Sequence, residues 1–313
     1  MKISVIGFGH IGSVIGASIA SNNNTVIAID KNNNLIKSFI DGDSPISEPG
    51  LQNLVSKKIK EKSLKFDNNV SSVSETEIII ITVGTPLGDD NHADISHLTE
   101  TCEEIEPYIR DNQLIIIKST VPPGTTRNVV HKILTKDKKV DIVFSPERLA
   151  EGNAINELST LPIVVGGITK NATLRASKFW RDSLGVQVIE VVSAETAELV
   201  KLANNSWIDL NIGLANDLAR LSDSLDYKVD ILEVIEAANS LKKGNSYVNI
   251  LTPSNGVGGY CLTKDPWFVY QLGKDNGISL NTIKAGRASN DIMPEYSALK
   301  IINYFNSKKK NIE

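Results

Sequence analysis

The sequence predicts an α/β protein with a doubly wound, mostly parallel Rossmann-like sheet, followed by an all-helical region built on a long central helix. Three observations predict it. A Gly-x-Gly-x-x-Gly turn stands between a short apolar strand and an apolar helix at the N-terminus. Continuous apolar runs, typical of strands buried on both faces, then alternate with helical segments up to residue 192. Apolar residues recur at helical spacing from Ala194 to Leu225.

Length and composition narrow the class of protein. A chain of 313 residues is long for one core, which favours two domains. The net charge of −4 and the lack of a basic, aromatic-rich patch argue against a nucleic-acid partner. No apolar run approaches the ~20 residues of a membrane span, and the first residues read as a strand instead of a signal peptide. Two cysteines, Cys102 and Cys261, are too few for a disulfide framework, so we expect a cytoplasmic protein.

The N-terminal segment carries a dinucleotide-binding fingerprint in its required context. Strand 3–6 leads into Gly7-Phe8-Gly9-His10-Ile11-Gly12 and a helix over 13–20, and strand 25–29 ends on an acid. Gly7 permits the turn, Gly9 lets a pyrophosphate approach the backbone, and Gly12 lets the helix pack on the strand. Asp30 is expected to bind the adenosine ribose and to repel the extra phosphate of NADP. The predicted cofactor is therefore NAD, held by Gly7, Gly9, Ile11, Gly12, Asp30 and Lys31; the alternative is a tight turn without a ligand.

Polar turns follow three of the predicted strands. The strands cover 77–83, 113–118 and 141–144, and further strands are expected at 161–165 and 186–192. Thr85, Thr120 and Glu147 lie in the turns that follow the first three. Because ligands of doubly wound sheets bind at the carboxyl ends of the strands, these turns predict a cleft.

The second half of the chain is predicted to be helical. The helix over 194–225 would exceed ~40 Å, enough to link two domains or to pair with a second copy. Lys201 and Asn205 share one of its faces, and a solvated helix face is the plainer interpretation of that pair. Further helices are expected at 229–238, 262–273 and 281–306, the last bent or broken by Pro294.

A glycine-dense loop precedes the helix over 262–273. It runs from Gly256 to Tyr260 and delivers Cys261, Lys264 and Asp265 in quick succession. The cysteine is placed near the first turn of that helix, where the helix N-terminus and Lys264 favour the thiolate. A thiolate attacks carbonyl carbon, so Cys261 is a candidate nucleophile; a buried structural cysteine is the alternative.

Five segments together resemble one family, the nucleotide-sugar 6-dehydrogenases that act on UDP-glucose, GDP-mannose and UDP-N-acetylhexosamines. They are the fingerprint, Lys118-Ser119-Thr120-Val121-Pro122-x-Gly124, Ser145-Pro146-Glu147-Arg148-Leu149-Ala150-Glu151-Gly152, Glu198-x-x-Lys201-Leu202-x-Asn204-Asn205 and the cysteine loop. The resemblance implies an NAD-dependent four-electron oxidation of the 6-hydroxymethyl group of a UDP-sugar to the uronic acid, through a thiohemiacetal and a thioester on Cys261.

The same resemblance implies roles for the other residues. Lys201 and Asn205 stabilise the oxyanion, Asp265 and Thr120 position a water, and Glu151 is the general base of thioester hydrolysis. Thr85, Thr120 and Lys264 complete the cofactor contacts, and no residue is assigned to a metal. The substrate site takes in Glu147, Arg148, Glu151, Lys201, Asn205, Asn249, Gly256, Gly258 and Gly259.

The motifs disagree about which sugar is the substrate. Arg148, where UDP-glucose enzymes typically carry Phe, and the segment 248–253 favour a UDP-N-acetylhexosamine, either UDP-ManNAc or UDP-GlcNAc. An arginine there would bond the acetamido carbonyl. Leu149-Ala150-Glu151-Gly152 instead resembles the UDP-glucose branch, so UDP-glucose stays the alternative, and Tyr247 stands where the acetylhexosamine branch often has arginine.

The resemblance also predicts domains and assembly. We expect an NAD-binding domain over 1–193, a helical dimerisation domain over 194–300 and, over 301–313, the start of a truncated third domain that in the family holds much of the UDP. A homodimer through the long helix follows from the family. Two other functions stay open: a catalytically silent NAD-binding and dimerisation fragment, and a β-hydroxyacid dehydrogenase of the 6-phosphogluconate type, which shares the layout but uses a lysine without a cysteine.

Overall fold

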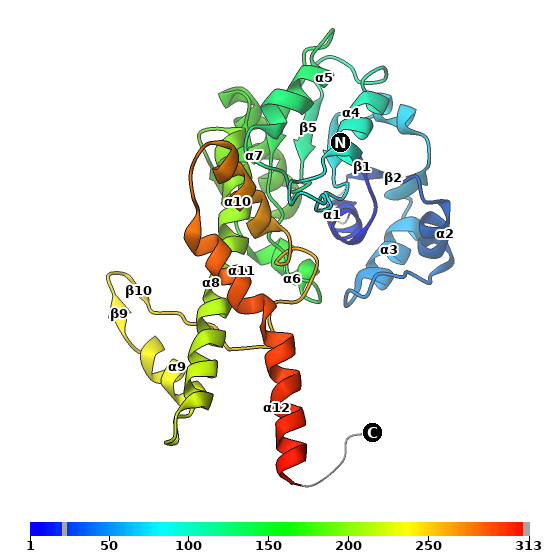
Figure 1. Cartoon of the computed structure of the whole chain (residues 1–313). Helices are drawn as coiled ribbons and strands as arrows, with labels where there is room; N and C mark the ends of the chain where they lie inside the picture. The colour runs from blue at the N-terminus through cyan, green and yellow to red at the C-terminus, as the bar shows by residue number, and fades with distance from the viewer. Residues whose placement is uncertain (21–23, 309–313) are drawn as a thin grey trace. The chain divides into compact units, whose positions relative to one another are not determined.

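A computed structural model of the chain describes residues 1–20 and 24–308. Its internal contacts divide the chain into two compact units (Figure 1). Unit 1 comprises Met1–Pro86 and Ala93–Lys201, and unit 2 comprises Leu87–His92 and the chain from Leu202 onward. The predicted domain boundaries at 193/194 and 300/301 stay predictions; the segment 301–313 begins inside a helix, and its last five residues lie outside the described part.

Unit 1 is built on an eight-stranded sheet of order β3-β2-β1-β4-β5-β6-β7-β8. The strands are β1 (Lys2–Ile6), β2 (Thr25–Ile29), β3 (Leu64–Asp67), β4 (Ile78–Ile81), β5 (Leu114–Ile117), β6 (Asp141–Phe144), β7 (Ile163–Gly167) and β8 (Val188–Glu190). Neighbouring strands are parallel except for β6 and β7, which run antiparallel. The predicted mostly parallel, Rossmann-like sheet is therefore confirmed, with one reversal that the apolar pattern does not encode.

The register aligns the strand ends that precede the predicted polar turns. Ile81 at the end of β4 pairs with Ile117 at the end of β5, and Ile117 pairs with Phe144 at the end of β6. The turns carrying Thr85, Thr120 and Glu147 therefore leave one edge of the sheet from three adjacent strands. This edge is where a doubly wound sheet binds its ligands.

Alternate strand residues enter two separate apolar cores, one on each face of the sheet. In β4, Ile78 and Ile80 enter one core while Ile79 and Ile81 enter the other. The first core is covered by α1 (His10–Ala20), α2 (Asn33–Asp41), α3 (Leu51–Lys60), α6 (Ala154–Thr160) and α7 (Lys170–Leu184). The second is covered by the short helix η1 (Val70–Glu75), α4 (Ser96–Ile105), η2 (Thr126–His131), α5 (Lys132–Leu134) and the start of α8 (Ala194–Ser224). Apolar strands with helices on both faces explain the continuous apolar runs of the sequence.

The long predicted helix is α8 (Ala194–Ser224), with 31 residues, which begins in unit 1 and continues into unit 2 (Figure 1). The rest of unit 2 contains α9 (Ile231–Asn239), α10 (Asp265–Asp275), α11 (Asn281–Asp291) and α12 (Met293–Ser307). The break between α11 and α12 falls at Ile292, beside Pro294, as predicted. Unit 2 also holds a small hairpin of β9 (Lys242–Lys243) and β10 (Ser246–Tyr247), which the sequence analysis did not anticipate.

Two helix starts differ from the prediction. α1 begins at His10, three residues early, because the backbone turns into the helix directly after Gly9. α10 begins at Asp265, with Pro266 in its first turn, where proline's missing N–H costs nothing. Cys261 consequently lies in a turn before α10 and not in the helix's first turn.

Candidate active site

The dinucleotide loop has the backbone that its glycines were expected to allow. Gly7 has φ +85°, and its N–H donates to the carbonyl of Ile29 at 2.9 Å. A Cβ on Gly12 would lie 2.0 Å from the Gly7 carbonyl oxygen, so no side chain fits there. Phe8 N–H donates to Asp30 Oδ2 at 2.7 Å, which holds the carboxylate beside the loop. The predicted strand, loop, helix, strand and acid thus form one compact feature.

A cavity of about 400 Å³ opens beside this loop, lined by Gly7, Gly9, Asp30, Lys31, residues of the turn after β4 and residues of α4. A Cβ built on Gly9 would meet nothing within 4 Å, so the backbone there faces open space. Asp30 is among the residues that line the cavity, and α1 begins at His10, directly after the lining residue Gly9. Three features here fit a dinucleotide: open space beside Gly9, the carboxylate of Asp30 for a ribose, and the N-terminus of α1 for a pyrophosphate. Ile11 packs partly against the first core.

One wall of the cavity was missed by sequence reasoning. His97, Glu100, Thr101 and Glu104 of α4 line it. Their spacing of three, four and seven residues places them on one helix face, and that polar stripe was the available signal. Lys31, predicted to contact the cofactor, instead pairs with Glu104 at 2.6 Å. The contact between Lys31 and a cofactor therefore stays a prediction.

The turn after β4 contributes a side chain without a partner. Thr85 is 4% exposed, and its hydroxyl has no hydrogen-bond partner within residues 1–20 and 24–308. A buried hydroxyl normally finds one, so this group is suited to a bound ligand. Thr120, after β5, is half-buried. Both lie where the fingerprint predicts the cofactor's path along the sheet edge.

The turn after β6 is organised around a buried lysine. Lys118 Nζ donates to the carbonyl of Pro146 at 3.1 Å and lies 3.5 Å from Glu147 Oε2. Burial lowers the pKa of Lys118, and the carboxylate of Glu147 opposes that shift. Glu147 also accepts from the N–H of Leu149, and a guanidinium nitrogen of Arg148 donates to the carbonyl of Pro162. The predicted substrate residues Glu147 and Arg148 are thereby both held by unit 1, whereas Glu151 is exposed.

Glu198 belongs to one of the family motifs, and the sequence analysis predicts no role for it. The structure gives it a defined position. Its carboxylate, 0% exposed, accepts the N–H groups of Gly124 at 2.6 Å and Thr126 at 2.7 Å. Burial raises its pKa to about 7 although these hydrogen bonds oppose the shift. The carboxylate joins α8 to the segment that follows Thr120. Lys201, one turn further along α8, is 6% exposed.

In unit 2, the predicted catalytic residue Asp265 is enclosed by Asn205, also predicted to be catalytic, and by Lys264, predicted to contact the cofactor. Asp265 is fully buried; its Oδ1 pairs with Lys264 Nζ at 2.7 Å and its Oδ2 accepts from Asn205 Nδ2 at 2.6 Å. The ammonium of Lys264 also lies 4.7 Å from the ring centre of Phe268. Two partners for one carboxylate offset its desolvation, since a buried charge requires such compensation. The amide of Asn205 is thereby fixed in orientation.

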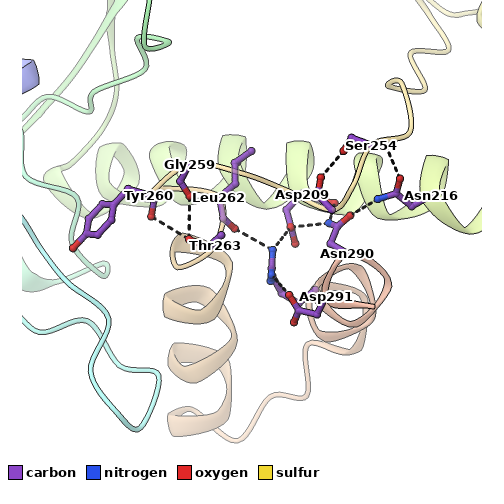
Figure 2. Close-up of polar contacts among 11 residues, drawn as sticks. Asp209, Asn216, Ser254, Gly259, Tyr260, Leu262, Thr263, Asn290 and Asp291 are labelled. Carbon is purple, nitrogen blue, oxygen red and sulfur yellow. Dashed lines mark hydrogen bonds and ion pairs between the residues drawn. The ribbon is translucent and has the colours of Figure 1, made fainter. Parts of the chain in front are cut away.

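The glycine loop is anchored to α8 and α11 by amide side chains (Figure 2). Asn216 Oδ1 accepts from Ser254 N–H at 2.8 Å, and Asn216 Nδ2 donates to Asn290 Oδ1 at 2.8 Å. Gly256 has φ +83°, and a Cβ there would lie 2.7 Å from the carbonyl oxygen of Asn290. By contrast, a Cβ on Gly258 or on Gly259 would meet nothing within 4 Å. The start of the loop is close-packed and its tip faces open space.

A buried ion pair supports the other end of the loop. Arg287 of α11 pairs with Asp209 of α8 at 2.6 Å and donates to the carbonyl of Leu262 at 3.3 Å. Figure 2 shows this chain of contacts from α8 through α11 to Leu262. Cys261, directly before Leu262, is exposed, and its carbonyl accepts the N–H groups of Lys264 and Asp265. The side chain of Cys261 is thus exposed, while the carbonyl of the next residue is held by a buried arginine.

The predicted site residues therefore fall into two groups. Unit 1 brings together the fingerprint residues, Thr85, Thr120 and Glu147 at one sheet edge; unit 2 brings together Asn205, Lys264, Asp265 and the glycine loop. Asn249 is exposed, and its carbonyl accepts from Asn211 Nδ2 at 2.8 Å. None of the described helices combines the length and apolarity required to cross a membrane.

Comparison with known proteins agrees with this organisation. Residues 1–183 match the NAD binding domain of the UDP-glucose/GDP-mannose dehydrogenase family, and residues 195–292 match its central domain. The UDP-N-acetyl-D-mannosamine dehydrogenase of Methanococcus maripaludis strain S2 is 34% identical over 316 residues, covering 100% of this chain and 70% of that protein. The Escherichia coli K12 enzyme of the same name is 31% identical, with 93% and 69% coverage.

Solved structures show the same likeness. The UDP-D-ManNAc dehydrogenase from Pyrococcus horikoshii superposes with a TM-score of 0.89 at 30% identity, covering 99% of this chain and 73% of that chain. A UDP-glucose dehydrogenase from Pyrobaculum islandicum gives a TM-score of 0.89 at 27% identity, with 97% and 71% coverage.

Proposed function

Because the chain belongs to the UDP-glucose/GDP-mannose dehydrogenase family, whose NAD binding domain it carries, we propose that it oxidises the 6-hydroxymethyl group of a UDP-N-acetylhexosamine to the uronic acid. The observation that carries the proposal is the exposed Cys261 on a loop held by buried polar contacts. The relatives named UDP-N-acetyl-D-mannosamine dehydrogenase favour UDP-ManNAc as the substrate.

The thiolate of Cys261 explains how a single site can oxidise an alcohol to an acid. Bound NAD⁺ supplies a hydride acceptor for each of the two oxidations. Between them, the Cys261 thiolate adds to the aldehyde carbon and forms a thiohemiacetal, whose oxidation yields a thioester. Water then attacks the thioester, and the thiolate leaves. The balance consumes one alcohol, one water and two NAD⁺, and releases one carboxylate, two NADH and three protons.

The remaining residues stabilise the charged substrate oxygen or take part in proton transfer during these reaction steps. Asn205, oriented by Asp265, and the buried Lys201 stabilise negative charge on the substrate oxygen, where low exposure strengthens the interaction. Asp265 and Thr120 position a water that carries protons away. Glu151 is exposed and acts as the base for the water that hydrolyses the thioester. Lys264 offsets the charge of Asp265.

UDP-glucose is the second candidate substrate. The Pyrobaculum islandicum likeness and the segment Leu149-Ala150-Glu151-Gly152 favour it. Arg148 also donates to Pro162 already, so a bond to an acetamido carbonyl would use its remaining N–H groups. The sugar that is turned over, from a panel of UDP- and GDP-sugars, decides between the two.

The test of the proposed function is the number of NADH molecules formed per sugar oxidised. We expect two with the wild-type protein and no more than one with Cys261→Ala, because the second oxidation proceeds from the thiohemiacetal. Cys102→Ala, at a buried position in the second core, is the matched control and should keep two. Two NADH from Cys261→Ala would assign the cysteine a structural role. One NADH from the wild type would indicate the 6-phosphogluconate type, and NAD⁺ binding without turnover a silent module.

We also propose a homodimer through α8. Trp207, Leu214 and Leu221 recur every seven residues along this helix and are 48%, 49% and 55% exposed. An apolar repeat of seven marks the seam along which two helices pack. Three large apolar side chains on one face are better explained by a second copy than by solvent.

A further inference from the structure

One buried carboxylate has no part in the chemistry proposed above. Glu48 lies in the loop between α2 and α3, and its side chain is 1% exposed. Its Oε2 accepts from the N–H of Gly152 at 2.8 Å and lies 3.1 Å from His10 Nε2. Its Oε1 accepts from the N–H of Ala154 at 2.8 Å. Glu48 thus joins three segments that are far apart in the sequence.

The segments that Glu48 joins belong to two different parts of the proposed site. His10 is the first residue of α1 and stands inside the dinucleotide loop, between Gly9 and Gly12. Gly152 and Ala154 flank the start of α6 and directly follow Glu151, the proposed base. The N-cap of α6, Asn153, makes no capping hydrogen bond with its own side chain. Glu48 therefore supplies from a distance the acceptor that a helix start requires.

Hydrogen bonds hold the exposed residues 151–153, whereas packing in the first core begins only at Ala154. An open cavity of about 650 Å³ lies beside it, lined by Glu48, Gly152, Asn153, Asn156 and others. Gly152, moreover, has φ +86° and is exposed. A buried carboxylate strongly favours keeping all of its donors, because losing one leaves charge without compensation. A change at His10 is consequently transmitted to Gly152 and Ala154 through one side chain.

We propose that Glu48 is a positioning residue that couples the dinucleotide loop to the segment carrying Glu151, so that binding of NAD⁺ orders the base of the last chemical step. The inference rests on the proposed function only for the role of Glu151. Cofactor binding at Gly7–Gly12 restrains His10, His10 restrains the carboxylate, and the carboxylate restrains Gly152 and Ala154. All of these residues lie in unit 1.

The test is amide hydrogen exchange, read by mass spectrometry with and without saturating NAD⁺. In the wild type we expect NAD⁺ to slow exchange in peptides covering 148–156 by about fivefold, the lower end of typical coupling between sites, as well as in peptides covering 7–14. In Glu48→Gln the slowing at 148–156 should disappear while that at 7–14 persists. The Gln amide cannot accept from all three donors.

Two further variants keep the test independent of folding. His10→Ala removes the link to the dinucleotide loop but leaves both backbone bonds of Glu48, and it should also abolish the slowing at 148–156. Glu157→Gln is the matched control, since Glu157 accepts from Ala150 N–H at 2.6 Å and so holds the same segment without contacting His10. It should speed exchange equally with and without NAD⁺, which is what a purely structural contact does.

The outcomes separate this inference from the proposed function. Slowing at 148–156 of wild-type size in both Glu48→Gln and His10→Ala would overturn the coupling. So would protection of 7–14 without any effect at 148–156 in the wild type. Lack of protection at both sites would refute NAD⁺ binding itself, and the proposed function with it.

Discussion

Glu198→Gln should change how the stability of the chain depends on pH. Burial raises the pKa of Glu198 to about 7 in the folded chain, from 4.5 for an exposed glutamate. The folded state therefore binds a proton more tightly than the unfolded state does. Ionising this group stabilises the unfolded chain more than the folded one, so the free energy of unfolding falls as pH rises from about 4.5 through 7.

The size of the effect follows from the two pKa values. Between pH 5 and pH 8, linkage gives a loss of about 2 to 3 kcal/mol from this one group. Glutamine does not titrate, so the variant lacks this part of the slope. Glutamine also accepts poorly from both Gly124 and Thr126, which costs about 1 to 3 kcal/mol at every pH. The pH-dependent difference between wild type and variant is the quantity that tests the reasoning.

Urea unfolding at pH 5 and pH 8 measures this difference. In a Trp207→Phe, Trp267→Phe background, the fluorescence reports on Trp180, which is fully buried in unit 1. Glu195→Gln is the control: Arg127 lowers the pKa of Glu195 to about 2, so its contribution to stability is present above 4.5 and lost only as pH falls toward 2. It should keep most of the slope between pH 5 and pH 8, because the charge of Glu195 is the smallest of the causes that act on the pKa of Glu198. Equal slopes for wild type and Glu198→Gln would refute the raised pKa.

Two further predictions concern the cofactor loop and the dimer. Gly9→Ala should weaken NAD⁺ binding in calorimetry without lowering the melting temperature, because its Cβ enters open space. Gly12→Ala should lower both the NAD⁺ affinity and the melting temperature, because its Cβ would lie 2.0 Å from a carbonyl oxygen. Unchanged NAD⁺ affinity in Gly9→Ala would place the pyrophosphate elsewhere. Leu214→Glu should shift the sedimentation of a dimer to that of a monomer, because the new charge in the α8 seam would be desolvated without a partner. Leu232→Glu, at another exposed leucine, serves as the control. A dimer that is unaffected by Leu214→Glu would exclude this seam.

Local patterns in the sequence were sufficient for the fingerprint, the long helix and every strand of the large sheet except β3. Apolar runs, glycines at turns and the helical period are properties of neighbouring residues, so strand β2 and helix α8 could be predicted almost to the residue. The apolar runs also placed Thr85, Thr120 and Glu147 in the turns at strand ends, because each residue follows the end of such a run. The start of α10 was predicted too early, because a glycine-rich turn and a helix's first turn look alike in sequence.

Partners that are distant along the chain were decided only by the tertiary structure. Glu48 meets Ala154 across 106 residues and Glu198 meets Gly124 across 74, and nothing near either glutamate in the sequence specifies those amides. The reversed direction of strand β7 depends likewise on how elements pack. The sequence by itself determined most of the strands and helices and which residue types follow the strand ends. The fold determined which carboxylates become buried; for Glu198, burial removes water from the carboxylate and raises its pKa.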